Sequence, residues 1–262
     1  MAARRLVVVG GGRMGEALVR GLRNAGWPAG DLGVAERSPD RRRQLAEVLV
    51  GVAVEGEVEA AAGHVVAVKP DDVGQACRAL AAAGATRVLS VAAGVTLARI
   101  EAELPTAAVV RAMPNTPALV GCGAAAVAGG RRAGEEDLVW AEEVLGAVGR
   151  VVRVGEADLD AVTGLSGSGP AYVFLVAEAL VEAGVHAGLP RTVSRELVLQ
   201  TILGAARMLT ETGEDASALR AAVTSPGGTT AAGLAVLEAA AVRSAFLAAV
   251  EAAAGRSRAL GG

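Results

Sequence analysis

The chain has 262 residues, which is long enough for one large domain or two small ones. Its net charge of −3 and aromatic content of 2% argue against a nucleic-acid surface, so no nucleic-acid partner is expected. Hydrophobic residues make up 52% of the chain, but proline and glycine interrupt the longest uncharged runs. We therefore expect no membrane span. We also expect no signal peptide and predict a soluble, cytoplasmic protein.

Cysteine and histidine are too few and too scattered to indicate a metal site. Cys77 and Cys122 lie far apart and form no C-x-x-C pattern, and His64 and His186 are the only histidines. We expect two reduced thiols and no metal.

Residues 6–26 predict a buried strand, a glycine-rich turn and a helix. The apolar run Leu6–Val9 is followed by Gly10, Gly12 and Gly15 at the G-x-G-x-x-G spacing. Apolar residues then recur every four positions, as on one face of a helix. In this context the glycines allow a tight turn and the approach of a dinucleotide pyrophosphate, with a ligand-free glycine turn as the alternative.

The next predicted strand ends at Glu36, about 20 residues after Gly15, where nucleotide folds place the acid that binds the ribose 2′-hydroxyl. Arg37 and Ser38 follow directly and could instead receive a 2′-phosphate. Glu36 favours NAD and Arg37 favours NADP, so both cofactors stay open. We expect Arg41–Arg43 to form the solvated face of the following helix.

Further apolar strands are predicted at 64–68, 87–91, 108–111 and 149–154, alternating with helical stretches. This alternation is typical of βαβ units and a parallel sheet. Lys69, which is the only lysine, and Asn115 each follow a strand. Both are therefore expected at the carboxyl edge of the sheet, where ligands bind.

After Gly155 the pattern is helical, with helices predicted at 158–185, 190–209, 216–223, 229–237 and 242–260. Pro170 is expected to kink the first of them. The fold class is thus α/β, with a Rossmann-type dinucleotide-binding domain over residues 1–154 and an all-helical domain over 155–262. Long Ala/Leu/Val helices with few aromatic residues rarely form a monomeric core, so we predict an intertwined homodimer.

A second candidate site is the loop Ser225–Thr230, which links two predicted helices. Its glycines and hydroxyls precede the later helix, where free N–H groups and the helix dipole favour a carboxylate. An ordinary capped loop is the alternative. A nucleotide site in one half and an anion-binding loop in the other suggest hydride transfer involving a small carboxylate.

Together these segments resemble pyrroline-5-carboxylate reductase. The matching motifs are 7–15, Ala67–Pro70, Ser90–Val95, Arg111–Pro117, Gly164–Phe174 and Ser225–Thr230. Their order and spacing agree over nearly the whole chain, and Arg111–Pro117 and Ser225–Thr230 are more specific than the glycine loop. His64 and Glu36 depart from the pattern, and Glu36 bears on any NADP preference.

The resemblance implies NAD(P)H-dependent reduction of 1-pyrroline-5-carboxylate to L-proline, the last step of proline biosynthesis. It also implies a dimerisation domain, with dimers assembled into a ring such as a decamer. The implied cofactor residues are Gly10, Gly12, Arg13, Met14 and Gly15 at the pyrophosphate, Glu36, Arg37 and Ser38 at the adenosine ribose, and Ala67, Val68, Lys69, Pro70, Ala92, Ala93, Gly94, Met113 and Asn115 on the nicotinamide side. The implied substrate residues are Ser225, Gly227, Gly228, Thr229 and Thr230, with the Thr230 hydroxyl on the ring nitrogen.

Three other functions fit parts of this pattern. A 3-hydroxyacid dehydrogenase would place a lysine on the long helix between the domains, and none occurs there. A reductase for another cyclic imine would need only a differently shaped pocket. A dinucleotide sensor without turnover would have no use for the Ser225–Thr230 loop.

Overall fold

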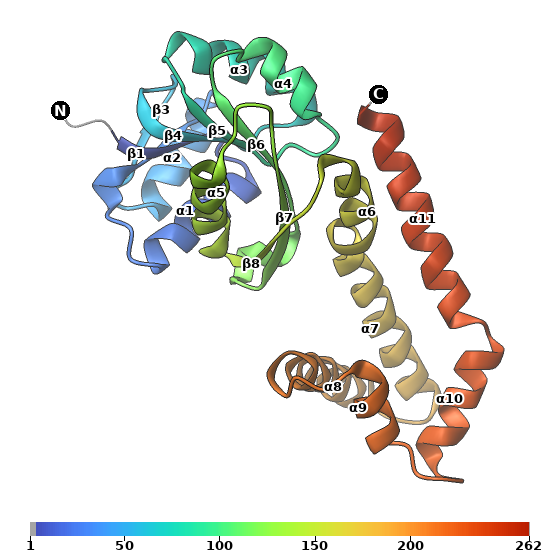
Figure 1. The fold of residues 1–262 in the computed structure, drawn as a ribbon. Coiled ribbons are helices and arrows are strands. Elements are labelled where there is room, and N and C mark those ends of the chain that lie inside the picture. Colours follow the sequence, from blue (N-terminus) through green and yellow to red (C-terminus); the bar gives the residue numbers. More distant parts are fainter. Residues whose placement is uncertain (1–3, 262) are drawn as a thin grey trace. The chain divides into compact units, whose positions relative to one another are not determined.

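In a computed structural model that describes residues 4–261, eight strands form a single sheet (Figure 1). The strands are β1 (Arg4–Val9), β2 (Leu32–Ala35), β3 (Ala53–Glu55), β4 (Ala61–Val66), β5 (Arg87–Ser90), β6 (Ala108–Pro114), β7 (Gly123–Gly129) and β8 (Gly149–Arg153). Their order in the sheet is β3-β2-β1-β4-β5-β6-β7-β8. The first six strands thus follow the Rossmann order, and the chain reverses direction across the sheet between β1 and β4.

Two strands, β7 and β8, run against the other six, so the expected parallel sheet needs a correction. β7 pairs antiparallel with β6, whereas β8 pairs parallel with β7. Neither β7 nor the short β3 was predicted. The Gly-Ala-rich sequence of β7 carries few of the β-branched and aromatic residues that mark a strand.

Helices cover both faces of the sheet and bury separate cores. They are α1 (Arg13–Asn24), α2 (Pro39–Val48), α3 (Val73–Ala82), α4 (Leu97–Glu103), α5 (Glu135–Gly146) and α6 (Leu159–Val162). Helices α1, α2 and α5 pack over Val8, Val65 and Leu89 on one face. Helices α3 and α4 pack over Val7 and Val66 on the other face. This two-sided burial explains why the strands are continuous apolar runs.

The described chain divides into two compact units. We call residues 4–168 with 250–261 the sheet unit, and residues 169–249 the helical unit. The predicted boundary at 154/155 falls earlier than this division. The first helical turns stay with the sheet because Leu159 of α6 is buried against Ala126 and Ala128 of β7.

The helical unit contains α7 (Gly169–His186), α8 (Arg191–Glu211), α9 (Ala216–Ala222), α10 (Thr229–Ala239) and the first part of α11 (Val242–Gly261). Helices α7 and α8 pack closely, because Gly184 leaves room for Ser194, whose hydroxyl donates to the Val181 carbonyl at 2.8 Å. Val181 is the buried apolar residue that α7 contributes, and α10 buries none.

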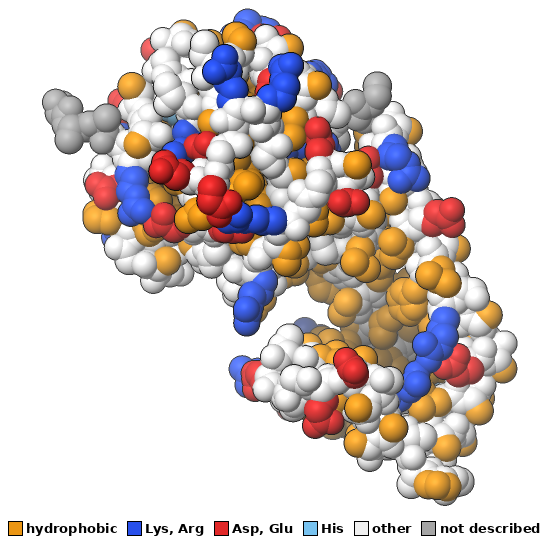
Figure 2. All heavy atoms as spheres, viewed as in Figure 1, with side chains coloured by type: hydrophobic (Ala, Val, Ile, Leu, Met, Phe, Trp, Pro, Cys, Tyr) orange, Lys and Arg blue, Asp and Glu red, His pale blue; other side chains and the backbone are white. Residues whose placement is uncertain are grey.

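Apolar side chains of the helical unit instead gather on its surface, where Figure 2 shows them in orange. Phe174 and Leu175 of α7 and Leu247 of α11 are each more than half exposed. By length and hydropathy, the segment Glu156–His186 is the one continuous helix of the described residues that could cross a membrane, and only 11% of its apolar window is buried. A chain that exposes this much apolar helix surface needs another surface to cover it.

The irregularity expected at Pro170 lies upstream of it. Residues Thr163–Gly167 form a π-helical turn just before Pro170 in the continuous helix Glu156–His186. Pro170 has no N–H for the Ser166 carbonyl four residues earlier, and this carbonyl accepts from Asn115 Nδ2 at 3.0 Å instead. Gly164 in this turn allows the close approach of α11, because a Cβ there would lie 2.5 Å from the Val250 carbonyl oxygen. The missing N–H of Pro170 and the close packing of α11 thus both act at this turn.

Candidate functional site

A cavity of about 680 Å³ opens at the carboxyl ends of β1, β2 and β4, next to the point where the strand order reverses. Its lining residues are Val9, Gly10, Gly12, Ala35, Glu36, Arg37, Gly56, Glu57, Val58, Ala67, Val68, Lys69, Asp72, Gln75, Ala76, Ala79, Ala82 and Ala83. Open α/β sheets bind nucleotides at this place. Seven of the predicted cofactor residues line it, namely Gly10, Gly12, Glu36, Arg37, Ala67, Val68 and Lys69.

The glycine loop has the geometry that a dinucleotide requires. Gly10 has φ +104°, and a Cβ there would lie 2.7 Å from the Ala67 carbonyl oxygen. A Cβ on Gly15 would lie 2.1 Å from the Gly10 carbonyl oxygen, so the loop and α1 pack backbone to backbone. At Gly12 a Cβ would meet nothing within 4 Å, and this residue lines the cavity. The loop thus leaves open space where a pyrophosphate would approach.

The backbone amides around the loop divide into occupied and open groups. Gly10 donates to the Ala35 carbonyl at 2.8 Å, and Gly11 donates to Glu36 Oε2 at 2.9 Å. Arg13 and Met14 begin α1, so their amides have no acceptor within the helix. A phosphate at this position would meet the amides of the first turn of α1, as at other helix N-termini.

Glu36 is engaged with the backbone on both carboxylate oxygens. Oε2 accepts from Gly11 and Oε1 accepts from the Ser38 amide at 2.8 Å. The Ser38 hydroxyl accepts from the Arg41 amide at 3.3 Å and caps α2. Glu36 and Ser38 therefore use their side chains to hold the backbone of the loop after β2.

Arg37 is the cation of this segment that faces the cavity. Its Nη2 donates to Asp72 Oδ1 at 2.7 Å and its Nη1 donates to Gln75 Oε1. Asp72 ends the 3-10 helix η2 (Pro70–Asp72), Gln75 lies in α3, and both line the cavity with Lys69. The sequence motifs did not identify Asp72 or Gln75, although their position just after Lys69-Pro70 was a signal.

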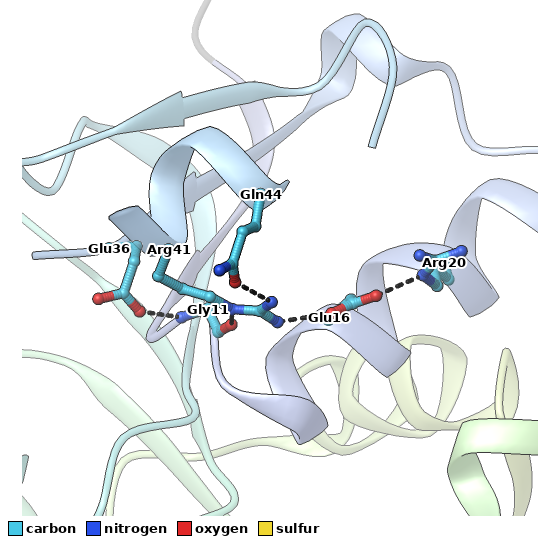
Figure 3. Close-up of polar contacts among 6 residues, drawn as sticks. All are labelled: Gly11, Glu16, Arg20, Glu36, Arg41 and Gln44. Carbon is cyan, nitrogen blue, oxygen red and sulfur yellow. Dashed lines mark hydrogen bonds and ion pairs between the residues drawn. The ribbon is translucent and has the colours of Figure 1, made fainter. Parts of the chain in front are cut away.

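Arg41 corrects the prediction that Arg41–Arg43 are solvated. Its Nε donates to the Gly11 carbonyl at 2.8 Å and its Nη2 donates to Glu16 Oε2 at 2.5 Å (Figure 3). Its side chain is 28% exposed, compared with 72% for Arg43. A run of three arginines on one helix thus contains one that belongs to the glycine loop.

Several predicted nicotinamide-side residues do not line this cavity. Asn115 is buried and its side chain is used for structure, because Oδ1 accepts from the Ala124 amide at 2.8 Å and Nδ2 donates to the Ser166 carbonyl at 3.0 Å. Met113 packs against Gly167 of the π turn, and Gly94 lies beside Leu260 of α11. The remaining predicted cofactor residues outside the cavity lining are Arg13, Met14, Gly15, Ser38, Pro70, Ala92 and Ala93.

The Ser225–Thr230 loop connects α9 to α10 within the helical unit. Gly227 has φ +68°, and the Gly228 amide donates to the Ser225 carbonyl at 3.0 Å. Thr229 begins α10, so it and Thr230 present amides without intrahelical acceptors. Ser225, Thr229 and Thr230 are exposed. The local geometry is that of an anion-binding helix start.

His64, Cys77 and Cys122 are titratable groups outside these segments. His64 is fully buried in β4, where Nε2 lies 3.0 Å from the Glu59 carbonyl and Nδ1 has no partner. Burial lowers the pKa of His64, and the Glu59 contact offsets this only in part. Both cysteines are free, and residues 4–261 contain no cluster of metal-ligating side chains. None of these groups lines the cavity.

Known protein families match both halves of the chain. Residues 5–94 match the family described as NADP oxidoreductase coenzyme F420-dependent, and residues 156–260 match pyrroline-5-carboxylate reductase dimerisation. A pyrroline-5-carboxylate reductase of Mycobacterium tuberculosis is 48% identical, over 89% of each chain.

Solved structures agree with these matches. A pyrroline-5-carboxylate reductase from Coxiella burnetii has a TM-score of 0.94 and 37% identity, covering 99% of both chains. A Plasmodium falciparum pyrroline carboxylate reductase with NADP bound has a TM-score of 0.85 and 31% identity, covering 100% of both. The dimerisation match covers the exposed apolar helices and accounts for them by oligomerisation. The chain therefore belongs to the pyrroline-5-carboxylate reductase family and is an NAD(P)H-dependent oxidoreductase.

Proposed function

We propose that the chain reduces 1-pyrroline-5-carboxylate to L-proline in the last step of proline biosynthesis. The observation that carries this proposal is the glycine-lined cavity of about 680 Å³ in a chain 48% identical to a named pyrroline-5-carboxylate reductase. A bound nicotinamide would supply a hydride to the carbon of the C=N bond, and the nitrogen would take up a proton. The protein then needs to bind and orient the two reactants.

We place the substrate carboxylate on the Ser225–Thr230 loop. The left-handed turn at Gly227 directs the chain into α10, and the amides of Thr229 and Thr230 lie at its positive end. The Thr230 hydroxyl would donate to or accept from the ring nitrogen. In this role Thr230 orients the imine and stabilises the nitrogen as its charge changes.

NADPH is the proposed preferred donor. Glu36 has both oxygens on backbone amides and is thereby diverted from the ribose, whereas Arg37 and Lys69 are cations that line the same cavity. A guanidinium has five N–H donors and binds a phosphate well. Arg37 uses two nitrogens on Asp72 and Gln75, and these contacts hold its guanidinium at the cavity.

A cytoplasmic homodimer through the helical domain 155–262, with dimers assembled into a ring such as a decamer, is the proposed assembly. The match to a dimerisation domain over residues 156–260 and the exposed apolar surfaces of α7, α8 and α10 support a dimer. The exposed Ser225–Thr230 loop would then be completed by the assembled dimer. Light scattering of the purified protein measures the number of subunits.

The first test is the initial rate of NADPH and of NADH oxidation with 1-pyrroline-5-carboxylate. Turnover supports the proposed reaction, and a higher kcat/KM for NADPH supports Arg37 as the ribose-side cation. If protein that binds nucleotide turns over neither donor, a panel of cyclic imines of other ring size distinguishes a related imine reductase from a sensor without activity.

A further inference from the structure

We propose that Arg41 is a positioning residue for the dinucleotide pyrophosphate. It fixes the Gly11–Gly12 peptide so that the Gly12 N–H faces the cofactor, and it balances the charge of Glu16 at the start of α1. The inference rests on the dinucleotide site and is independent of which imine is reduced.

Side chains from another segment bind both polar groups of the Gly11 backbone. Its N–H donates to Glu36 Oε2 at 2.9 Å, and its carbonyl accepts from Arg41 Nε at 2.8 Å (Figure 3). Both side chains come from the segment that follows β2, and not from the glycine loop itself. We call this pair of contacts, from Glu36 and Arg41 to Gly11, the clamp. Because the clamp is made by another segment, the loop does not depend on its own flexible glycines for its conformation.

The planar trans peptide bond between Gly11 and Gly12 fixes the direction of the Gly12 N–H. The described chain has no cis peptide, so the Gly11 carbonyl and the Gly12 N–H point in opposite directions from one planar group. Holding the carbonyl on Arg41 therefore turns the Gly12 N–H away from Arg41. Gly12 lines the cavity and has open space around its Cα. The clamp thus presents one more amide donor beside those of the first turn of α1.

Arg41 also balances a negative charge at the start of α1. Glu16 lies in the first turn of α1, where its carboxylate would repel a pyrophosphate. Its oxygens accept from Arg41 at 2.5 Å and from Arg20 at 2.7 Å. Burial alone would raise the pKa of Glu16, but the hydrogen bonds from Arg41 and Arg20 lower it below its usual value. Glu16 therefore stays ionised, and the two arginines give this cluster a net positive charge.

The neighbouring arginines do not share this role. Arg42 Nη1 donates to the Glu36 and Arg37 carbonyls, and Arg43 pairs only with Asp40 at the surface. Arg43→Ala is therefore a matched control, because it removes the same charge from the same helix without a contact to the glycine loop.

The experiment measures dissociation constants for NADPH and NADH by nicotinamide fluorescence, with KM, kcat and the melting temperature of each variant. Arg41→Ala is expected to weaken both cofactors equally, by about tenfold, since each hydrogen bond to a charged group contributes on that order. KM for NAD(P)H should rise in proportion, with kcat at saturation within about twofold of the parent. Arg43→Ala should leave both constants within about twofold.

Two further variants separate the roles. Arg41→Ala combined with Glu16→Gln should regain about threefold of the lost affinity, because it removes a carboxylate that Arg20 alone would then balance. Arg41→Lys keeps the charge but replaces the two nitrogens that bond Gly11 and Glu16 with a single ammonium, so it should weaken binding by about threefold. It carries the test if Arg41→Ala does not fold. Unchanged affinity in folded Arg41→Ala, a loss confined to NADPH, or no recovery with Glu16→Gln would each overturn the proposal.

Discussion

Replacing Arg37 with alanine is expected to lower the preference for NADPH over NADH about tenfold. A hydrogen bond to a charged group contributes about 1.5–3 kcal/mol. The Arg37 side chain is 60% exposed, so solvent screening places its contribution at the lower end of that range, which corresponds to about tenfold in affinity. The loss should appear in KM and Kd for NADPH, while the values for NADH change less than about twofold.

The assay compares kcat/KM for the two donors at constant ionic strength, because an exposed cation is screened by salt. Arg78→Ala is the control, since Arg78 lies in α3, is also exposed and does not line the cavity. An equal loss for NADH would assign Arg37 to the loop structure and not to the 2′-phosphate. No loss for either donor would refute the role given to Glu36 and Arg37 together.

Three further predictions test the substrate loop, the glycine loop and the buried histidine. Thr230→Ala should lower kcat/KM for the imine roughly tenfold or more with cofactor affinity unchanged, whereas Thr230→Ser should retain most activity, and equal rates would remove Thr230 from the reaction. Gly15→Ala places a Cβ 2.1 Å from the Gly10 carbonyl oxygen and should weaken both cofactors more than about tenfold, while Gly146→Ala, which meets no atom within 4 Å, serves as its control in the same binding assay. Lowering the pH from 7 to 5 should destabilise the protein in urea titrations, because His64 is protonated near its usual pKa in the unfolded state, whereas burial opposes its protonation in the folded state. The free energy of unfolding should change by at most about 1.4 kcal/mol per pH unit from this group, and His64→Leu should reduce that dependence.

The sequence predicted the glycine loop and the cations at the cavity because their chemistry depends on local order. Gly10 is required by its positive φ and Gly15 by its contact with Gly10 in the same strand-turn-helix unit, and Lys69 lies just after a strand. A parallel sheet brings the ends of its strands to one edge whatever the loops between them do. The glycine spacing and the parallel-sheet fold class together therefore predict where the cavity lies.

Arg41 and Asn115 could not be assigned in this way. Arg41 acts through a residue thirty positions away, and nothing in a run of three arginines marks which one turns inward. Asn115 stands in a specific motif, yet its side chain links the Ala124 amide to the Ser166 carbonyl, and this function depends on the antiparallel β7 that the sequence did not reveal. Such contacts arise from tertiary packing and have no periodicity to read.

The sheet unit is discontinuous in sequence, and this has a consequence for biosynthesis. Its last segment, residues 250–261, is made only after the whole helical unit, yet Ser257 is buried there and donates to Asp160 Oδ1 at 2.6 Å. Domains generally fold as units while the chain leaves the ribosome. During translation, the surface around Asp160 and Gly164 is therefore covered only after α11 has been made. A chain whose translation stops before α11 would have its glycine loop formed, but this surface would be open to proteases.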